Sequence, residues 1–307
     1  MSQAPGDVVV IGSINMDLVA SVERAPQIGE TVAAVGFEYV PGGKGSNQAV
    51  AAARAGATTR MVGRLGDDEF GATLLRFLSE SGVDTLHVLR TPGFPSGLAL
   101  ITLVRQSDNS IIVVAGSNGE ISPTDIDAVA IGPNDIVITQ FEIPLRAVEH
   151  SLDRARAAGA RSMLNPSPAR ECEPELLAKA DILVVNETEL AWFLGEAVAV
   201  EPGPLIEGAK RLRSRSDQVI VVTLGEAGSL VLSGDSALIV PARKSDVVDT
   251  TGAGDTFAGS LAAELASGSG IADSVSYANA AASLCCETMG AGTAIPARSA
   301  VLAALDT

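Results

Sequence analysis

The segment VVDTTGAGDTFAGSL, residues 247–261, is the most informative stretch of the chain. Two carboxylates, Asp249 and Asp255, flank a run of small residues, and an apolar segment of helical character follows at once. The N–H groups at the start of a helix attract anions, and small side chains leave those groups accessible. Asp255 is therefore either a simple helix cap or a group that acts on the partner of a bound anion.

The composition limits the classes of partner. The 307-residue chain is 47% hydrophobic, enough to bury a large core, and only 3% aromatic, with a formal net charge of −16. An acidic surface repels nucleic acids and anionic membranes, and so few aromatic residues cannot form a stacking platform for bases. We therefore expect no nucleic-acid partner and no membrane partner. An anionic substrate would need a local helix start or a metal ion.

The expected compartment is the cytoplasm. The opening residues MSQAPGD lack the basic and apolar regions of a signal peptide, and no run of about 18 apolar residues could span a membrane. The three cysteines, Cys172, Cys285 and Cys286, are an odd set in which two are adjacent, so a disulfide framework is not expected.

Short apolar segments alternate with helical segments along most of the chain. The apolar segments have the continuous character of buried strands; they include residues 7–14, 59–66, 135–139, 181–185 and 219–222. This alternation predicts an α/β fold with a doubly wound, mostly parallel sheet and helices on both faces. We expect one domain over residues 1–307.

Two regions interrupt the alternation, at about residues 15–41 and 96–116. Their apolar segments are β-branched and no helix separates them; GLALITLV and SIIVVAG, around Asp108–Asn109, look like a hairpin. We expect a small antiparallel sheet inserted into the core as a lid. Both alternating faces of LALITLV are apolar, so one could cover a ligand while the other forms a homodimer. The alternative is an ordinary sheet edge.

Familiar nucleotide motifs are absent from the sequence. GSINMD, after the first strand, has one glycine where a dinucleotide-binding loop needs three, and PGGKGSN lacks P-loop spacing. The two histidines, His87 and His150, cannot assemble a triad or a histidine–cysteine metal site. Polar and glycine clusters instead occur at strand ends and helix starts, where open α/β sheets bind ligands; they lie at 15–17, 42–49, 140–144, 186–189, 223–228 and 249–255.

Two segments, GGKGSNQAVAAARAGA (42–57) and DTTGAGDTFAGSL (249–261), closely resemble the signatures of the ribokinase-like, or phosphofructokinase-B-type, carbohydrate kinases. The resemblance runs from GSINMD to GAGTAIP and includes AGSN, NPSPARE, NETE and TLGEAG in order. Paired motifs in this order are far more specific than an isolated GAGD. The resemblance implies an enzyme that transfers the γ-phosphoryl group of ATP to the 5-hydroxyl of D-ribose, which gives ribose 5-phosphate.

The resemblance also implies roles for individual residues. Asp255 would accept the proton of the sugar hydroxyl as general base, and Gly252, Ala253 and Gly254 would form an anion hole for the transferring phosphoryl group. The residues implied in sugar binding supply amides, charged groups or close backbone approach; they are Asn15, Asp17, Gly42, Gly43, Lys44, Asn47, Glu142 and Asp255.

The implied co-substrate is ATP and the implied metal ion is Mg²⁺. Asn186 and Glu189 match an N-x-x-E motif that organises Mg²⁺ and phosphates, with Glu189 acting through water because Mg²⁺ keeps several waters. The other residues expected at the nucleotide are Thr223, Leu224, Gly225, Gly228, Gly254 and Asn279. Asn279 stands where a histidine often meets the adenine, so stacking would be lost there.

A monovalent cation, usually K⁺, is implied beside the anion hole. Most of its ligands would be backbone carbonyls; the positions are Asp249, Thr251, Cys285, Thr288, Gly290 and Ala294. Ala294 stands at a position where the resemblance implies a hydroxyl residue, so a side-chain ligand would be lost and the dependence on K⁺ would be weakened or altered.

Alternatives remain open for the substrate and for catalysis itself. The same chemistry could serve 2-deoxyribose, fructose, 2-keto-3-deoxygluconate or a nucleoside, because one hydroxyl or methylene cannot be read from sequence. A non-catalytic sugar or nucleotide sensor on the same fold is a further alternative. The intact Asp255, GAG and NETE motifs argue against a sensor.

Overall fold

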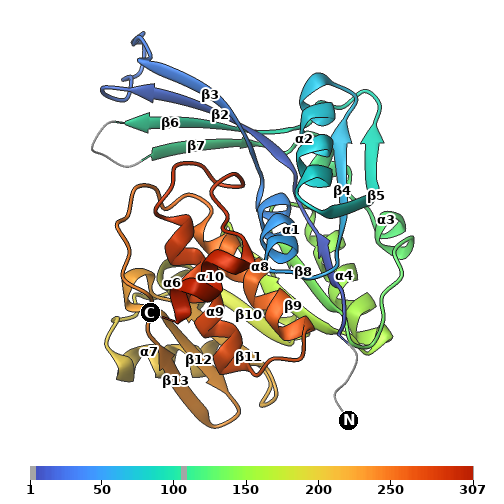
Figure 1. Ribbon diagram of the computed structural model, residues 1–307, viewed down its shortest axis with the longest axis vertical. Helices are drawn as coiled ribbons and strands as arrows, with labels where there is room; N and C mark the ends of the chain where they lie inside the picture. The colour runs from blue at the N-terminus through green and yellow to red at the C-terminus, as the bar shows by residue number, and fades with distance from the viewer. Residues whose placement is uncertain (1–4, 105–108, 307) are drawn as a thin grey trace.

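The computed structural model describes residues 5–104 and 109–306, and within them the main feature is a nine-stranded sheet (Figure 1). Its strand order is β13-β12-β11-β10-β9-β8-β1-β4-β5. The strands are β1 (Val8–Ile11), β4 (Thr59–Gly66), β5 (Val83–Thr91), β8 (Ile136–Gln140), β9 (Arg161–Asn165), β10 (Ile182–Asn186), β11 (Val219–Thr223), β12 (Ser229–Ser233) and β13 (Ser236–Val240). Neighbours pair in parallel except at β11–β12 and β12–β13. The predicted doubly wound, mostly parallel sheet is confirmed.

Helices cover both faces of this sheet, and successive strand residues enter two separate cores. Val8 and Val10 pack into one core, whereas Val9 and Ile11 pack into the other. The first core is covered by α1 (Lys44–Arg54), α2 (Glu69–Glu80), α8 (Ala253–Ala266), α9 (Ile271–Cys285) and α10 (Arg298–Leu305). The second is covered by α3 (Pro123–Asp127), α4 (Leu145–Ala158), α5 (Pro174–Lys179), α6 (Glu187–Leu194) and α7 (Pro202–Leu212). Burial on both faces explains the uninterrupted apolar strands.

Close packing between α1 and α8 positions the site. A Cβ at Gly259 of α8 would lie 2.3 Å from the carbonyl oxygen of Gln48 on α1, so only glycine permits this approach. The contact brings two consecutive amides of α1, Asn47 and Gln48, beside Asp255 in the first turn of α8.

The second sheet stands apart from the first and has the order β3-β2-β6-β7 (Figure 1). It comprises β2 (Asn15–Val22), β3 (Gly36–Gly42), β6 (Gly97–Val104) and β7 (Asn109–Val114). The β6–β7 hairpin is confirmed, although Asp108 of its expected turn lies outside the described residues. The expected all-antiparallel pairing is wrong, because β2 and β6 pair in parallel. Both strands follow strands of the parallel sheet, β1 and β5, and therefore leave it in the same direction.

Two strand boundaries also differ from expectation. The first strand ends at Ile11 rather than Ile14, and Asn15 opens β2 instead of closing β1. The residues between β1 and β2 contact the first turn of α1, where the N–H of Ser46 donates to the carbonyl oxygen of Ser13 at 2.8 Å. Residues 31–35, within the region expected to form the small sheet, precede β3 without joining it.

Candidate active site

Asp255 lies at the N-terminal turn of α8 and is only 7% exposed. Its Oδ2 accepts a hydrogen bond from Asn47 Nδ2 at 3.0 Å, and its Oδ1 accepts one from Gln48 Nε2 at 3.1 Å. Burial raises the pKa of Asp255, and it outweighs the nearby Lys44 charge and the two amide donors, which favour the ionised form. The carboxylate is therefore a fixed, partly desolvated group with a stronger affinity for a proton than an exposed aspartate.

The Asp255 carboxylate belongs to a wider amide network that the sequence did not predict. Gln48 Nε2 also donates to Asn165 Oδ1 at 3.2 Å, and Gln48 Oε1 accepts from Gln140 Nε2 at 2.7 Å. Asn165 in turn donates to the carbonyl oxygen of Val184 at 2.9 Å. The Gln48 side chain thus links Asp255, through hydrogen bonds, to residues of β8, β9 and β10.

The predicted sugar residues converge beside this network. Glu142 Oε2 accepts from the N–H of Lys44 at 3.1 Å and from Asn15 Nδ2 at 3.5 Å. Gly42 packs directly against Asp17, and a Cβ at position 42 would lie 2.2 Å from a carboxylate oxygen of Asp17. Gly43 has φ +88, and a Cβ would lie 2.6 Å from the N–H nitrogen of Asn15. Gly43 is therefore required by its backbone conformation and by close backbone approach, whereas a side chain at Gly42 would displace the Asp17 carboxylate.

Two residues behind the sugar set were missed. Asn118 donates to Asn15 Oδ1 at 2.7 Å and to the Ile14 carbonyl oxygen at 3.2 Å, while it accepts from the Ile14 N–H at 2.9 Å. Ser13 donates to Glu142 Oε2 at 2.6 Å. The AGSN segment was part of the resemblance, yet no local pattern showed that Asn118 would fix Asn15 across the fold.

Asp17 has the most informative electrostatic environment. Burial, and to a smaller extent the nearby Glu142 and Asp255 carboxylates, together raise its pKa to about 7. It lines a cavity of about 120 Å³ between the four-stranded sheet and the loop after α9, together with Val40, Ile101 and Gly290. The Asp17 carboxyl group thus faces the cavity under the small sheet.

A second cavity, of about 220 Å³, joins the base to the expected phosphate residues. Its lining includes Lys44, Asn186, Glu189, Thr223 and Gly254 as well as Asp255. Burial alone would lower the pKa of Lys44, but Asp255, Glu142 and Glu189 outweigh it and raise that pKa, so the side chain is a cation. This cavity therefore combines a carboxylate, an ammonium group and a helix start.

The glycine turn before α8 is open toward this cavity. A Cβ at Gly254 would meet no atom within 4 Å, and its N–H has no hydrogen-bond partner within residues 5–104 and 109–306. Gly252 has φ +79, which favours glycine at the N-cap. The N–H of Ala253 donates to the Thr250 carbonyl oxygen at 3.2 Å. The expectation that this N–H is free to bind an anion is therefore not met.

The N-x-x-E motif forms a capping box. Asn186 Oδ1 accepts from the Glu189 N–H at 2.8 Å, and Glu189 Oε2 accepts from the Asn186 N–H at 2.9 Å. Thr223 pairs with Asn186 in the parallel register of β10 and β11. The motif has a structural function at the start of α6 and still presents both residues to the cavity.

The expected nucleotide loop has mixed accessibility. Gly225 and Gly228, in and after the short 3₁₀ turn η2 (Gly225–Ala227), have φ +54 and +96, while Leu224 is buried. Asn279 is 5% exposed and donates to Val240 O at 3.0 Å while it accepts from Ser229 Oγ at 2.7 Å. Its amide fixes the ends of β12 and β13, so the structure does not bring it to the cavity as a free nucleotide ligand.

Of the predicted cation residues, Thr251 and Gly290 donate hydrogen bonds to Asp249. Its Oδ1 accepts from the N–H and the hydroxyl of Thr251 at 2.9 and 2.7 Å, and its Oδ2 accepts from the Gly290 N–H at 3.0 Å. Burial would raise the pKa of Asp249, but these donors outweigh it and lower that pKa. Among the other predicted cation residues, Cys285 and Ala294 are buried, whereas Thr288 is exposed. The carboxylate stays ionised and orders the turn.

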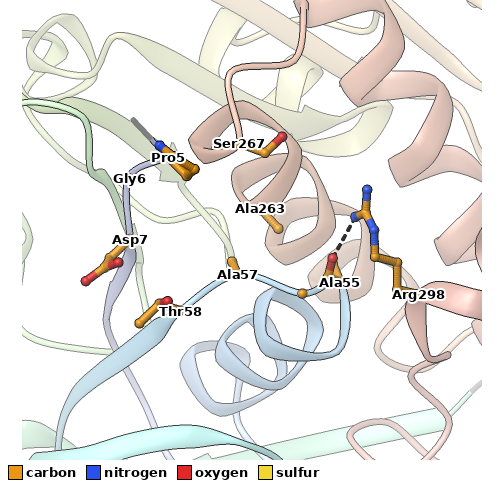
Figure 2. A pocket seen from close by; sticks show the side chains of 10 residues that line it. Pro5, Gly6, Asp7, Ala55, Ala57, Thr58, Ala263, Ser267 and Arg298 are labelled. Carbon is orange, nitrogen blue, oxygen red and sulfur yellow. Dashed lines mark hydrogen bonds between the residues drawn. The ribbon is translucent and has the colours of Figure 1, made fainter. Parts of the chain in front are cut away.

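Other parts of the described chain offer less chemistry. A cavity of about 220 Å³ at the start of β1 is lined by Pro5, Ala57, Ala263 and Arg298, whose guanidinium donates to the Ala55 carbonyl oxygen (Figure 2). No group of three or more His, Cys, Asp or Glu side chains in residues 5–104 and 109–306 could hold a metal ion. No helix of the described residues is long and apolar enough to cross a bilayer.

Comparisons with known proteins agree with these motifs. The model of the pfkB family carbohydrate kinases matches residues 6–298. Ribokinase from Bacillus subtilis is 38% identical over 302 residues, which are 96% of this chain and 98% of that protein. Deoxyribokinase from Salmonella typhi is 38% identical over 260 residues, which are 83% of this chain and 84% of that protein.

A bifunctional relative and a solved structure extend the comparison. A ribokinase/ribose-5-phosphate isomerase A from Fructilactobacillus sanfranciscensis is 39% identical over 299 residues, and the match covers 96% of this chain but 55% of that longer protein. The solved structure of Arabidopsis thaliana ribokinase, complexed with ribose and ATP, has a TM-score of 0.87 at 32% identity. It covers 99% of this chain and 100% of that one.

Proposed function

Because the chain belongs to the pfkB family of carbohydrate kinases, we propose that it is an ATP-dependent ribokinase. The reaction transfers the γ-phosphoryl group of ATP to the 5-hydroxyl of D-ribose and yields ribose 5-phosphate and ADP. The observation that carries the proposal is the position of Asp255. Its carboxylate lies at the start of α8, in one cavity with Lys44, Glu189 and the open Gly254 N–H.

Asp255 acts as the general base in this proposal. As the sugar oxygen attacks the γ-phosphorus, the hydroxyl proton passes to a carboxylate oxygen of Asp255, and the bond to ADP breaks. The amides of Asn47 and Gln48 hold the carboxylate in one orientation before sugar arrives. A fixed base avoids the entropy of ordering during the reaction.

The phosphoryl group meets preorganised positive charge. The loose transition state places negative charge on the transferring oxygens, and the Gly254 N–H and the dipole of α8 point toward that charge. Lys44, which lines the same cavity, adds a full positive charge. We assign Mg²⁺ to the Asn186–Glu189 side, where bound Mg²⁺ would neutralise phosphate charge through its own waters.

The loop around Asp249 is the proposed K⁺ site. Carboxylate, hydroxyl and carbonyl oxygens suit a hard monovalent cation, and Asp249 and Thr251 supply the first two. The cation would support the turn that leads into α8 rather than touch the sugar. Ala294 contributes no side-chain oxygen, so we expect weak but measurable K⁺ activation.

Ribose is the preferred sugar, and 2-deoxyribose is the second candidate. The 38% identity to a deoxyribokinase over 83% of the chain favours that alternative specifically. Asp17 and Asn15 present a carboxylate and an amide that could bind vicinal hydroxyls, and Asn15 is held in place by Asn118. A site built to bind a hydroxyl discriminates strongly against an analogue that lacks it.

We also propose a homodimer formed through the small sheet, and a cytoplasmic location. Supporting the dimer, Tyr39, Leu100 and Ile112 lie in one row across this sheet and are 58%, 40% and 64% exposed. The side chains of the opposite face, such as Asp17 and Ile101, line the cavity beneath it. A cytoplasmic location fits a kinase that consumes ATP and has free cysteines.

The test is ADP release from ATP and Mg²⁺ across ribose, 2-deoxyribose, fructose, 2-keto-3-deoxygluconate and a nucleoside, with and without K⁺. We expect ribose to give the highest kcat/KM, with stimulation by K⁺. A higher kcat/KM for 2-deoxyribose would replace ribose and leave the assignment of Asp255 intact. Failure to phosphorylate any sugar, together with sugar-induced thermal stabilisation, would indicate a sensor instead.

A further inference from the structure

We propose that Gln48 is a positioning residue for catalysis, which holds the Asp255 carboxylate in its reactive orientation from within the protein interior. This inference rests on the proposed function and deepens it. Gln48 is fully buried and lines neither the cavity that contains Asp255 nor the cavity under the small sheet. It acts through Asp255 and does not touch the sugar or the nucleotide.

The contact is direct and involves one defined oxygen. Gln48 Nε2 donates to Asp255 Oδ1 at 3.1 Å, while Asn47 Nδ2 donates to the other oxygen, Oδ2, at 3.0 Å. Asn47 also belongs to the proposed sugar set, so its hydrogen bonds can change when sugar binds. Gln48 has no such second task, and its bond can persist through the whole reaction.

Two further amides fix the polarity of the Gln48 side chain. Gln140 Nε2 donates to Gln48 Oε1 at 2.7 Å, and Asn165 Oδ1 accepts from Gln48 Nε2 at 3.2 Å. Asn165 is itself oriented, because its Nδ2 donates to the Val184 carbonyl oxygen at 2.9 Å. Rotating the Gln48 amide by half a turn would place Oε1 against the Asp255 carboxylate and Asn165 Oδ1, and would place Nε2 against the donor of Gln140.

Besides orienting the carboxylate, Gln48 affects the pKa of Asp255. Burial raises the pKa of Asp255, and the Gln48 donor works against that effect by stabilising the ionised carboxylate. Without the donor the pKa of Asp255 is higher, so a larger fraction of Asp255 is protonated at any pH near that pKa. The acid limb of the pH–kcat profile therefore reports this contact, and a purely structural contribution of Gln48 does not move that limb.

The first variant is Gln48→Met, which keeps the length and shape of the side chain and removes the donor. We expect kcat to fall about tenfold and the acid limb to move upward by about one pH unit, the shift that matches loss of one hydrogen bond to a charged group. The KM for ribose should change less than about twofold, because Gln48 is absent from the cavity linings.

Gln218→Met is the matched control. Gln218 is also fully buried, and its Nε2 donates to the carbonyl oxygens of Leu177 and Ala180 at 2.8 Å each, away from the site. This control should lose stability without any shift of the pH profile. An unshifted acid limb in Gln48→Met, or the same shift in Gln218→Met, would overturn the proposal.

A second variant covers the case in which Gln48→Met fails to fold. Gln140→Met leaves both donors to Asp255 in place and removes only the group that orients the Gln48 amide. We expect a smaller upward shift of the acid limb in the same direction. A foldable Gln140→Met with an unchanged profile would refute the orienting step.

A stability measurement separates this inference from the proposed function. The pH dependence of unfolding is compared between wild type and Gln48→Met, each with and without Asp255→Asn. We expect Gln48→Met to lower stability more at pH 8 than at pH 5, and Asp255→Asn to abolish that difference. Inactivity of the wild type with every sugar would reject the kinase function alone, whereas a pH-independent cost of Gln48→Met would reject the contact alone.

Discussion

Asn47 and Asp255, 208 residues apart in the sequence, are joined by a hydrogen bond of 3.0 Å between Nδ2 and Oδ2. The side chain assigned to sugar recognition therefore also restrains the proposed base. Binding of the sugar and alignment of the carboxylate are coupled through this single contact. The coupling arises because Gly259 lets α8 approach α1 closely.

Replacement of the base tests the central assignment. Asp255→Asn should lower kcat by about 10²–10⁴-fold, the range that general base catalysis contributes, and should leave ribose binding within a fewfold. Stability should not fall at neutral pH, because a buried carboxylate with a raised pKa is removed. The measurements are steady-state kinetics and calorimetric ribose binding. Asp125→Asn, at a buried aspartate paired with Arg64 outside the site, is the control.

A loss of kcat smaller than about tenfold in Asp255→Asn would show that another group takes the proton. The Asp125→Asn control should instead lower stability and leave kcat within a fewfold, since it removes the negative charge that pairs with Arg64. Equal losses of kcat in both variants would indicate a general effect on folding.

Asp17 makes both sugar binding and stability depend on pH. Its pKa is about 7 in the folded protein against an ordinary value of 3.8, because burial and then Glu142 and Asp255 disfavour its charge. Between these two values the folded state binds more protons than the unfolded state, so the free energy of unfolding falls as pH rises. Asp17→Asn should remove this decline and be more stable than wild type above pH 7.

The same variant should raise the KM for ribose about tenfold or more, because it replaces the ionised acceptor. For the wild type, the KM should increase as the pH falls below about 7. Denaturant unfolding and kinetics from pH 4 to 9 measure both effects. Asp235→Asn, at an exposed aspartate, serves as control and should give a curve parallel to wild type. A stability difference for Asp17→Asn that is constant over this range would contradict the prediction.

The variant Gly254→Ala tests whether the phosphate groups bind beside Gly254, because it should change ATP binding without harming the fold. A Cβ at this position meets no atom within 4 Å, so the variant should fold with equal or slightly higher stability, by about 0.5–1 kcal/mol. The methyl group would enter the cavity where we place the phosphoryl group, so kcat/KM for ATP should fall about tenfold or more.

Gly203→Ala is matched to this variant, since Gly203 lies near the start of α7 and its Cβ would also meet open space. It should gain similar stability and keep full activity. Thermal unfolding and kinetics with varied ATP measure both variants. Unchanged kinetics of Gly254→Ala would remove Gly254 from the phosphate site.

Asn118→Leu tests a residue that sequence analysis missed. Its loss leaves the N–H and carbonyl groups of Ile14 unpaired, which should cost about 1–3 kcal/mol of stability. Asn15 loses its orienting donor, so the KM for ribose should rise about tenfold while the KM for ATP stays within about twofold.

Asn279→Leu is the comparison for Asn118→Leu, because Asn279 is another buried asparagine with several hydrogen bonds. It should destabilise the protein without changing the KM for ribose. Urea unfolding and kinetics with each substrate varied provide the measurements. An equal rise in ribose KM for both variants would assign the effect to general loosening.

The sequence predicted those features that are encoded locally. Alternating apolar and helical segments predicted the parallel sheet, and the glycine–aspartate segment before α8 predicted the open helix start. The parallel pairing of β2 with β6 was not predictable, because it depends on the directions in which two distant strands leave the large sheet. The apolar alternation of a strand fixes which side chains face the core, but it does not fix whether a neighbouring strand pairs with it in parallel.

Buried amides were the main omission. Gln48 contacts Asp255 across 207 positions, and Asn118 contacts Asn15 across 103. A glutamine inside an alanine-rich helix gives no local sign of such partners. Asn279 shows the opposite error, since a position expected to meet the nucleotide is occupied by hydrogen bonds to β12 and β13. Long-range packing, and not local chemistry, decided each case.

The proposed dimer depends on the exposed face of the small sheet. Leu18, Leu100 and Ile112 are register partners in adjacent strands, and Ile112 on the edge strand β7 is 64% exposed. Ile112→Arg should place a charge within the apolar contact and shift the protein from dimer to monomer, at least a tenfold weakening of association. Sedimentation velocity over a concentration series measures the change.

The control for the dimer is Leu238→Arg. Leu238 is 47% exposed on β13, the edge of the large sheet, and its replacement should leave the dimer unchanged. Because β7 also borders the sheet whose other face covers Asp17, the monomer should show a higher KM for ribose. A wild type that is monomeric at concentrations giving full activity would refute the dimer, and the apolar row would then be a solvent-exposed sheet face.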